Sequence, residues 1–122
     1  MPDTLQERSG AQVLVCDPSG PPVTTEQDAL DLISATYFGG DTVAVPAQRL
    51  DERFFTLETG LAGAIMQKFT SYGVRLAIIG DITPHLAASS ALRALVRESN
   101  RARHVWFLPD LDALDERLQA SR

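Results

Sequence analysis

The sequence predicts an α/β domain with a mainly parallel sheet of four or five strands and four helices. Three observations predict this fold class. Short apolar runs alternate along the chain with longer amphipathic segments, the pattern of repeated β-α units. The 122 residues are enough for one domain, spanning 1–122, with one core. Hydrophobic residues make up 44% and charged residues 22%, which is typical of a soluble globular protein.

Four apolar runs predict strands at residues 12–16, 42–45, 75–79 and 104–108. The run at 75–79 is the most apolar, which favours a place at the centre of the sheet. A weaker strand at 5–8 would fold back on the strand at 12–16 through Ser9-Gly10. Its pairing would make the sheet five-stranded and mixed.

The first two helices have recognisable start and stop residues. Thr24 or Thr25 caps the first, with 24–27 fitting a capping box, and this helix carries Ala29, Leu30, Ile33 and Tyr37 before Gly39-Gly40. The second helix is expected from about Glu58 to Tyr72, ending at Gly73. A short turn capped by Asp51 precedes it.

The third and fourth helices follow the last two strands. Thr83 caps the third and Pro84 starts it, and it runs to about Arg101. We expect Asn100 to end this helix, because asparagine tolerates the left-handed conformation. Ser99 lies on its inward face, and Arg93, Arg97 and Arg101 form an outward face that we expect to be solvated. Asp110 caps the fourth helix.

Composition excludes several classes of protein. The net charge is −5 and the pI is about 4.8, which argues against general binding to nucleic acid or an anionic membrane. The single cysteine, Cys16, cannot form an internal disulfide and is expected to be an inert core thiol. Because the sequence shows no signal-type leader and no run of 18 apolar residues, we expect a cytoplasmic protein.

No catalytic, metal or cofactor site is predicted. His85, His104 and Cys16 do not have the spacing of a zinc site, and the glycines fit neither a phosphate-binding loop nor a dinucleotide fingerprint.

Lys68, the only lysine, lies within the core-facing stripe of the second helix. We expect it to be at least half buried, with its ammonium near a carboxylate, either Asp81 or Glu98. A ligand pocket around Lys68 is the alternative.

Gly60 and Gly63 lie on another side of the same helix. Glycine in a helix costs about 1 kcal/mol relative to alanine, which predicts compensation by a closely packed neighbour, either a helix of the same chain or a helix of a partner. We therefore expect Gly63→Ala to destabilise the protein.

The start of the second helix is a candidate binding surface. Loops at the carboxyl ends of parallel strands form the natural binding edge, and free backbone N–H groups there favour negative charge. Thr56, Glu58 and Thr59 would form this surface, with Thr59 as a possible phosphate acceptor. The alternative is that Glu58 only stabilises its own helix through the dipole.

Several segments together resemble a bacterial family known as domain of unknown function 4180. They are Phe54-Phe55-Thr56-Leu57-Glu58-Thr59-Gly60-Leu61-Ala62-Gly63, Gln67-Lys68-Phe69, Ala77-Ile78-Ile79-Gly80-Asp81, Glu98-Ser99-Asn100 and Val105-Trp106-Phe107. The resemblance covers nearly the whole chain and implies no activity, because the family has none assigned. The family usually has an acid where this sequence has Ala64.

More distantly, the layout is similar to the STAS fold of anti-sigma-factor antagonists. Those domains carry a loop ending Asp-Ser-Ser/Thr-Gly-Leu, whose first serine is phosphorylated. Alignment on Gly60-Leu61 places Glu58 at the phosphorylated position and Leu57 at the aspartate. The resemblance implies partner recognition at this edge, with a fixed charge in place of a phosphorylation switch.

These observations predict a non-enzymatic regulatory or interaction domain that binds an unidentified protein, with a homodimer left open. A small-molecule sensor using a pocket around Lys68 is the alternative. The expected binding residues are Thr56, Glu58, Thr59, Gly60, Lys68, Asp81, Glu98, Ser99 and Asn100.

Overall fold

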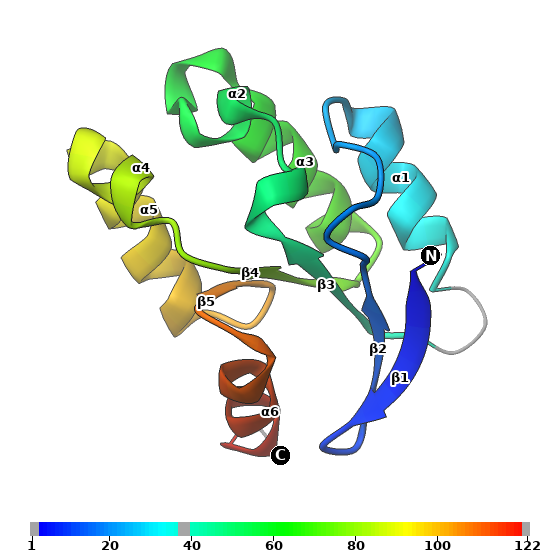
Figure 1. Ribbon diagram of the computed structural model, residues 1–122. Coiled ribbons are helices and arrows are strands. Elements are labelled where there is room, and N and C mark those ends of the chain that lie inside the picture. Colours follow the sequence, from blue (N-terminus) through cyan, green and yellow to red (C-terminus); the bar gives the residue numbers. More distant parts are fainter. Residues whose placement is uncertain (1–2, 37–39, 121–122) are drawn as a thin grey trace.

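The computed structural model describes residues 3–36 and 40–120. These residues form a mixed α/β fold with five strands and six α-helices (Figure 1). In chain order the elements are β1 (Thr4–Arg8), β2 (Ala11–Val15), α1 (Glu26–Ser34), β3 (Thr42–Pro46), the 3₁₀ turn η1 (Ala47–Arg49), α2 (Glu52–Phe55), the 3₁₀ turn η2 (Leu57–Thr59), α3 (Leu61–Ser71), β4 (Arg75–Ile79), α4 (Thr83–Ala88), α5 (Ser90–Arg101), β5 (Val105–Leu108) and α6 (Leu111–Ala120).

The strands lie in the sheet in the order in which they occur in the chain. β2 to β5 are parallel, whereas β1 pairs antiparallel with β2. The turn between β1 and β2 uses Ser9 and Gly10, both with positive φ. The predicted fifth strand and the mixed sheet are therefore confirmed. β4 lies inside the sheet, as its apolar sequence predicts, although β3 occupies the middle position.

The helices cover the two faces of the sheet unequally (Figure 1). Right-handed crossovers between sequentially ordered parallel strands place α1 to α5 on one face. The larger core lies there and contains Val43, Leu76, Phe54, Phe69 and Leu92. The smaller core lies on the other face, where Leu114 and Leu118 of α6 pack against Val13, Ala44, Ala77 and Trp106.

The predicted second helix begins three residues later than expected. Gly60 has φ +80°, a left-handed conformation that glycine adopts readily, and it forms the N-cap of α3. Glu58 and Thr59 therefore belong to η2 and not to the first helical turn. The alternative in which Glu58 stabilises its own helix through the dipole loses its geometric basis.

The predicted third helix is two helices. Ser89 has an extended backbone, and its hydroxyl accepts a hydrogen bond from the Leu92 N–H, which starts α5 anew. Thr83 is the first residue of α4 and does not cap it: Ile82 is the N-cap, and the Asp81 carboxylate before it accepts a hydrogen bond from the Thr83 N–H. This division and the short helix α2, which Asp51 caps as predicted, raise the number of helices from four to six.

The capping box of α1 consists of Thr25 and Asp28, one position later than expected. α1 ends at Ser34, and the expected continuation to Tyr37 and Gly39 lies outside the described residues. Cys16 is buried in the larger core, and its burial raises the pKa of the thiol to about 12. The thiol is thus protonated at neutral pH, as expected for an inert core cysteine.

The Asp28 carboxylate gives the stability a dependence on pH. Its pKa lies below the ordinary value, mainly because the Thr24 N–H donates a hydrogen bond to it. Such a group stabilises the fold above its ordinary pKa, and this contribution is lost as the pH falls through the lowered pKa. We expect the free energy of unfolding to decrease below about pH 4. Between pH 7 and pH 3 it should decrease less for Asp28→Asn than for the wild type. Urea unfolding of both proteins at pH 7 and pH 3 checks this. Equal decreases in the wild type and in Asp28→Asn would contradict it.

Candidate functional site

The segment Thr56–Gly60, here called the loop, separates two hollows on the helical face of the protein. Thr56 and Glu58 line one hollow, and Leu57 and Gly60 line the other. The loop belongs to the connection that follows β3, and its neighbour α4 follows β4. The structure therefore places it beside segments that leave the carboxyl ends of two parallel strands, where open α/β folds have their binding sites.

Thr59 holds the loop in shape. Its hydroxyl lies 2.6 Å from the Arg53 carbonyl oxygen and 2.9 Å from that of Thr56, and it also accepts a hydrogen bond from the Leu61 N–H. These contacts use the side chain within its own turn. Thr59 is thus a positioning residue for Thr56 and Glu58.

The first hollow, here called the polar cleft, has a volume of about 310 Å³. It is lined by Phe55, Thr56, Glu58, Pro84, His85, Ala88 and Ser89. The rings of Phe55 and His85 stack with their centres 4.1 Å apart. Glu58 is exposed and makes no ion pair or side-chain hydrogen bond with a described residue. The cleft therefore combines an aromatic wall with an available carboxylate.

The second hollow, here called the interhelical groove, is open to solvent between α3 and α5 and has a volume of about 500 Å³. Its largely apolar lining includes Gly60, Gly63, Met66 and Thr70 on one side and Leu95 and Ser99 on the other. A methyl group at Gly60 or Gly63 would meet no atom within 4 Å. The expectation that a neighbour packs closely against these glycines is wrong, because α3 and α5 leave a space there.

Gly63→Ala is therefore expected to stabilise the protein and not, as the sequence predicted, to destabilise it. Alanine favours the helix over glycine by about 1 kcal/mol, and no neighbour opposes the added methyl group. We expect the variant to unfold at a higher temperature than the wild type. Gly60→Ala is the contrast, because the positive φ of Gly60 strains an L-residue there. A calorimetric melting temperature that falls for Gly63→Ala would contradict this packing.

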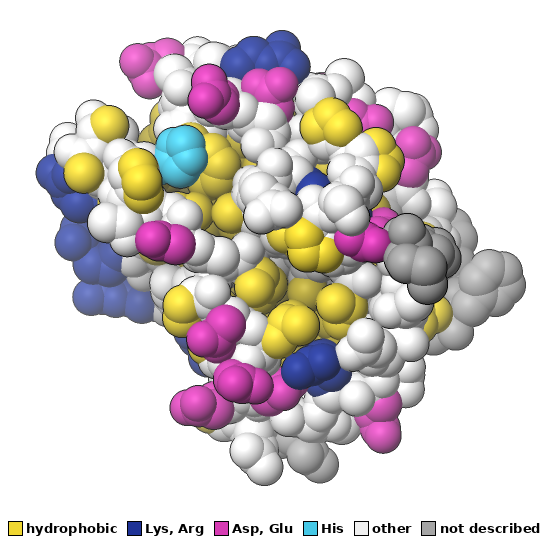
Figure 2. Space-filling view, in the orientation of Figure 1, with side chains coloured by type: hydrophobic (Ala, Val, Ile, Leu, Met, Phe, Trp, Pro, Cys, Tyr) yellow, Lys and Arg dark blue, Asp and Glu magenta, His cyan; other side chains and the backbone are white. Residues whose placement is uncertain are grey.

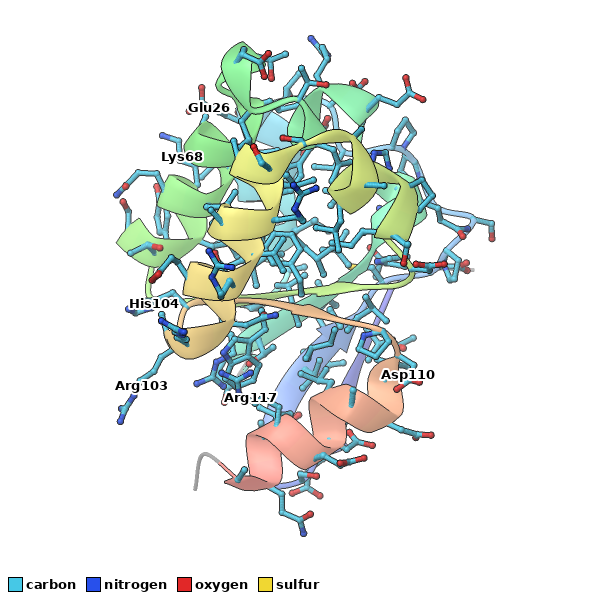
Figure 3. All side chains as sticks on the ribbon, turned by 90° about the vertical axis from the view of Figure 1, so that its left-hand side faces the viewer. Glu26, Lys68, Arg103, His104, Asp110 and Arg117 are labelled. Atoms are coloured by element: carbon cyan, nitrogen blue, oxygen red, sulfur yellow. The ribbon has the colours of Figure 1, made fainter. Side chains whose placement is uncertain are left out.

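Lys68 lies apart from the loop. Its side chain is 36% exposed, so the expected partial burial is confirmed. The expected partners are wrong, because its ammonium lies 3.6 Å from Glu26 of α1 and pairs with neither Asp81 nor Glu98 (Figure 3). α3 packs on α1, and this contact turns Lys68 away from the interhelical groove.

Asp81 and Glu98 have local structural partners. Hydrogen bonds from the side chain and the backbone N–H of Thr83 lower the pKa of Asp81. Glu98 is exposed and pairs with Arg101 one turn further along α5, at 3.9 Å. Neither residue lines the polar cleft or the interhelical groove, and neither pairs with Lys68.

Asn100 covers the free edge of the sheet. Its side chain donates to the Phe107 carbonyl oxygen at 3.2 Å and accepts from the Phe107 N–H at 2.7 Å. β5 is the last strand of the sheet, so these bonds occupy backbone groups that another strand would otherwise use. The expectation that Asn100 ends α5 in a left-handed conformation is wrong: the helix continues through Arg101.

The nine expected binding residues therefore do not form one site. Thr56, Glu58, Thr59 and Gly60 are brought together at the loop, and Ser99 joins Gly60 in the lining of the interhelical groove. Sequence reasoning missed the contribution of His85 to the polar cleft. The adjacent aromatic residues Phe54-Phe55 were the available sequence signal. The sequence could not show that they meet α4, because that contact is a tertiary one.

The described part of the chain holds neither a metal-binding cluster nor a membrane-spanning helix. No three His, Cys, Asp or Glu side chains within it group in a way that could hold a metal ion. None of the helices in residues 3–36 and 40–120 has the length and apolar character needed to cross a bilayer.

Comparison with protein families gives a match over residues 8–118, to a model described as "Domain of unknown function (DUF4180)". The match covers nearly the whole chain and confirms the resemblance based on the sequence segments. Neither the curated proteins nor the solved structures include a match to the chain.

Proposed function

The chain belongs to the DUF4180 family, and we propose that it acts in the cytoplasm as a non-enzymatic regulatory domain that binds a protein partner. The docking surface consists of the loop, the polar cleft and the adjoining end of the interhelical groove. The observation that carries this proposal is the meeting of the two hollows at the loop, with Glu58 exposed in one and Gly60 in the other.

The chemistry of this surface suits a protein. Protein interfaces combine an apolar centre with a polar rim, and the groove and the cleft supply these side by side. The Glu58 carboxylate could accept a charge-assisted hydrogen bond from a partner's arginine. The half-buried His85 ring, which is stacked on the buried Phe55 ring, offers a flat surface for the same guanidinium. The open space at Gly63 admits a partner side chain against the backbone of α3.

The STAS-like fold is part of this proposal. Its support is the position of Gly60-Leu61 at the start of α3, after β3, in a chain of repeated β-α units. In that arrangement Glu58 provides a permanent negative charge where STAS domains carry a phosphorylated serine.

A small-molecule sensor is the second candidate function, with its ligand pocket at a different place from the one expected around Lys68. Lys68 lines neither the polar cleft, the interhelical groove nor the hollow on the α6 side of the sheet, so none of these supports the pocket expected around it. A hollow of about 260 Å³ on the α6 side of the sheet is lined by Val15, Ala44, Pro46, Ile79 and Leu111, among others. Apolar walls of this kind suit a small apolar ligand, which would raise the melting temperature.

Capture from an extract of the native host tests the docking surface. We expect Glu58→Lys to lose a protein that the wild type retains, because the reversed charge repels the partner's cation. Glu7→Lys is the matched control, since Glu7 is an exposed acid on β1, at the far edge of the sheet. Circular dichroism should show both variants folded. If both variants retain the same proteins as the wild type, the surface is wrongly assigned.

A further inference from the structure

Charge is segregated along one flank of the molecule. Residues 93–104 contain four arginines and one histidine against a single acid, Glu98, in a chain whose net charge is −5. Residues 110–117 contain four acids and one base, Arg117, and one of the acids, Asp115, pairs with Arg8 of β1. Figure 2 shows basic side chains gathered over α5 and acidic side chains gathered below them, over α6.

The two charged helices lie on opposite faces of the sheet beside its edge strand β5 (Figures 1 and 3). In Figure 3 this flank faces the viewer, with α5 above, α6 below and Arg117 between them. The flank therefore has a basic half and an acidic half, separated by β5.

Several charges on this flank are available for contact. Arg97 and Arg103 are exposed and pair with no carboxylate of the described residues. Asp112 and Glu116 are exposed too, and neither makes an ion pair there. Arg97 and Arg101 are one helical turn apart, as are Asp112 and Glu116, so both pairs have a spacing of about 6 Å along their helices.

Between the charged halves lie the Asn100–Phe107 hydrogen bonds and the Arg117 guanidinium, which donates to the Asn100 carbonyl oxygen and lies over the Trp106 ring. Beside this flank, on the α4 and α5 side of β5, a hollow of about 260 Å³ is lined by Leu86, Val96, Phe107, Leu108 and Pro109, together with the polar residues Asp81 and Thr83, among others. Because Asn100 occupies the outward backbone groups of Phe107, strand addition to β5 is obstructed and contact must use side chains.

We propose that this flank is a self-complementary interface at which a second copy of the chain docks, giving a two-fold symmetric dimer. A two-fold axis along β5, in the plane of the sheet, exchanges the two faces. It places α5 of each protomer against α6 of the other, so that each basic half meets an acidic half. This surface is separate from the loop and leaves it accessible.

Exposed ion pairs each contribute little and are screened by salt, so the dimer is expected to be weak and salt-sensitive. In sedimentation experiments at about 20 mM salt, the wild type should approach twice the mass of the 13.3 kDa chain as its concentration rises. At about 500 mM salt it should sediment as a monomer. A monomer at all concentrations in low salt would overturn the proposal.

A charge-swap experiment identifies the surface. Arg97→Glu with Arg101→Glu makes both halves acidic, and Asp112→Lys with Glu116→Lys makes both basic, so each double variant alone should remain monomeric in low salt. An equimolar mixture should regain the dimer, because both contacts of the two-fold interface again join opposite charges. Glu7→Lys should dimerise like the wild type. A mixture that stays monomeric, while circular dichroism shows both variants folded, would overturn the proposal.

The arginines could instead bind nucleic acid. In that case a labelled duplex would bind the wild type, fail to bind Arg97→Glu with Arg101→Glu, and no dimer would form. This result would also overturn the proposal.

Discussion

Replacing Trp106 with alanine is expected to lower the free energy of unfolding by about 3–5 kcal/mol. Trp106 is 1% exposed and lies between the sheet and α6 in the smaller core. The guanidinium carbons of Arg75 and Arg117 lie over its ring, 4.4 and 4.5 Å from the centre, and its indole N–H donates to the Ala102 carbonyl oxygen. Alanine removes this packing and leaves the end of α5 with fewer contacts to the sheet.

Urea unfolding followed by far-ultraviolet circular dichroism measures the effect, because the variant has no tryptophan to follow by fluorescence. Trp106→Phe is the control. It keeps an aromatic ring but loses the indole hydrogen bond, so the expected loss is about 1–2 kcal/mol. An alanine variant as stable as the phenylalanine variant would contradict the role given to the packed ring.

Replacing Arg49 with methionine is expected to cost about 3 kcal/mol of stability. Arg49 is 4% exposed and joins three segments: its guanidinium pairs with Asp3 at 2.9 Å and donates to the carbonyl oxygens of Asp17 and Pro21. Methionine fills similar space but leaves the carbonyls and the Asp3 carboxylate without these donors.

Arg49→Lys separates charge from geometry. Lysine keeps the positive charge but not the planar set of donors, so we expect a stability between those of the wild type and Arg49→Met. The same unfolding measurement checks both variants. Equal stability of Arg49→Met and the wild type would show that these bonds are not needed to hold the segments.

Much of the fold could be predicted because its information is local. Apolar runs located four of the five strands, and the turn at Ser9-Gly10 indicated the fifth, while Gly73 and Asp110 marked the end of one helix and the start of another. The break at Ser89 could not be predicted in this way. Residues 83–101 favour one continuous helix, and the extended backbone of Ser89 divides it.

The candidate site was predicted less completely. The loop at Thr56–Gly60 could be located because strand-end loops and helix starts have sequence signals. Lys68 shows the limit of the helical pattern: the pattern indicated partial burial correctly, but it could not indicate that the neighbour is α1, with Glu26, instead of α4 or α5. Asn100 illustrates the same limit, because its bonds to Phe107 depend on where β5 lies in the sheet.

Gly63 shows how a correct observation can lead to a wrong expectation. Glycine in a helix requires an explanation, and close packing within the chain is the usual one. Here the glycine borders an open groove. The glycine is therefore explained by the proposed contact with a partner and not by packing in the core of this protein. Gly63→Ala, although stabilising, would be unfavourable for that contact.

Hydrogen–deuterium exchange on the complex with the captured partner tests the central claim, that the loop and its two hollows form the docking surface. We expect partner binding to slow exchange in the loop, at the start of α3 and in α4. β1 and β2, at the far edge of the sheet, should exchange as in the free protein. Slowed exchange at β1 and β2, with the loop and α3 unchanged, would contradict the assignment.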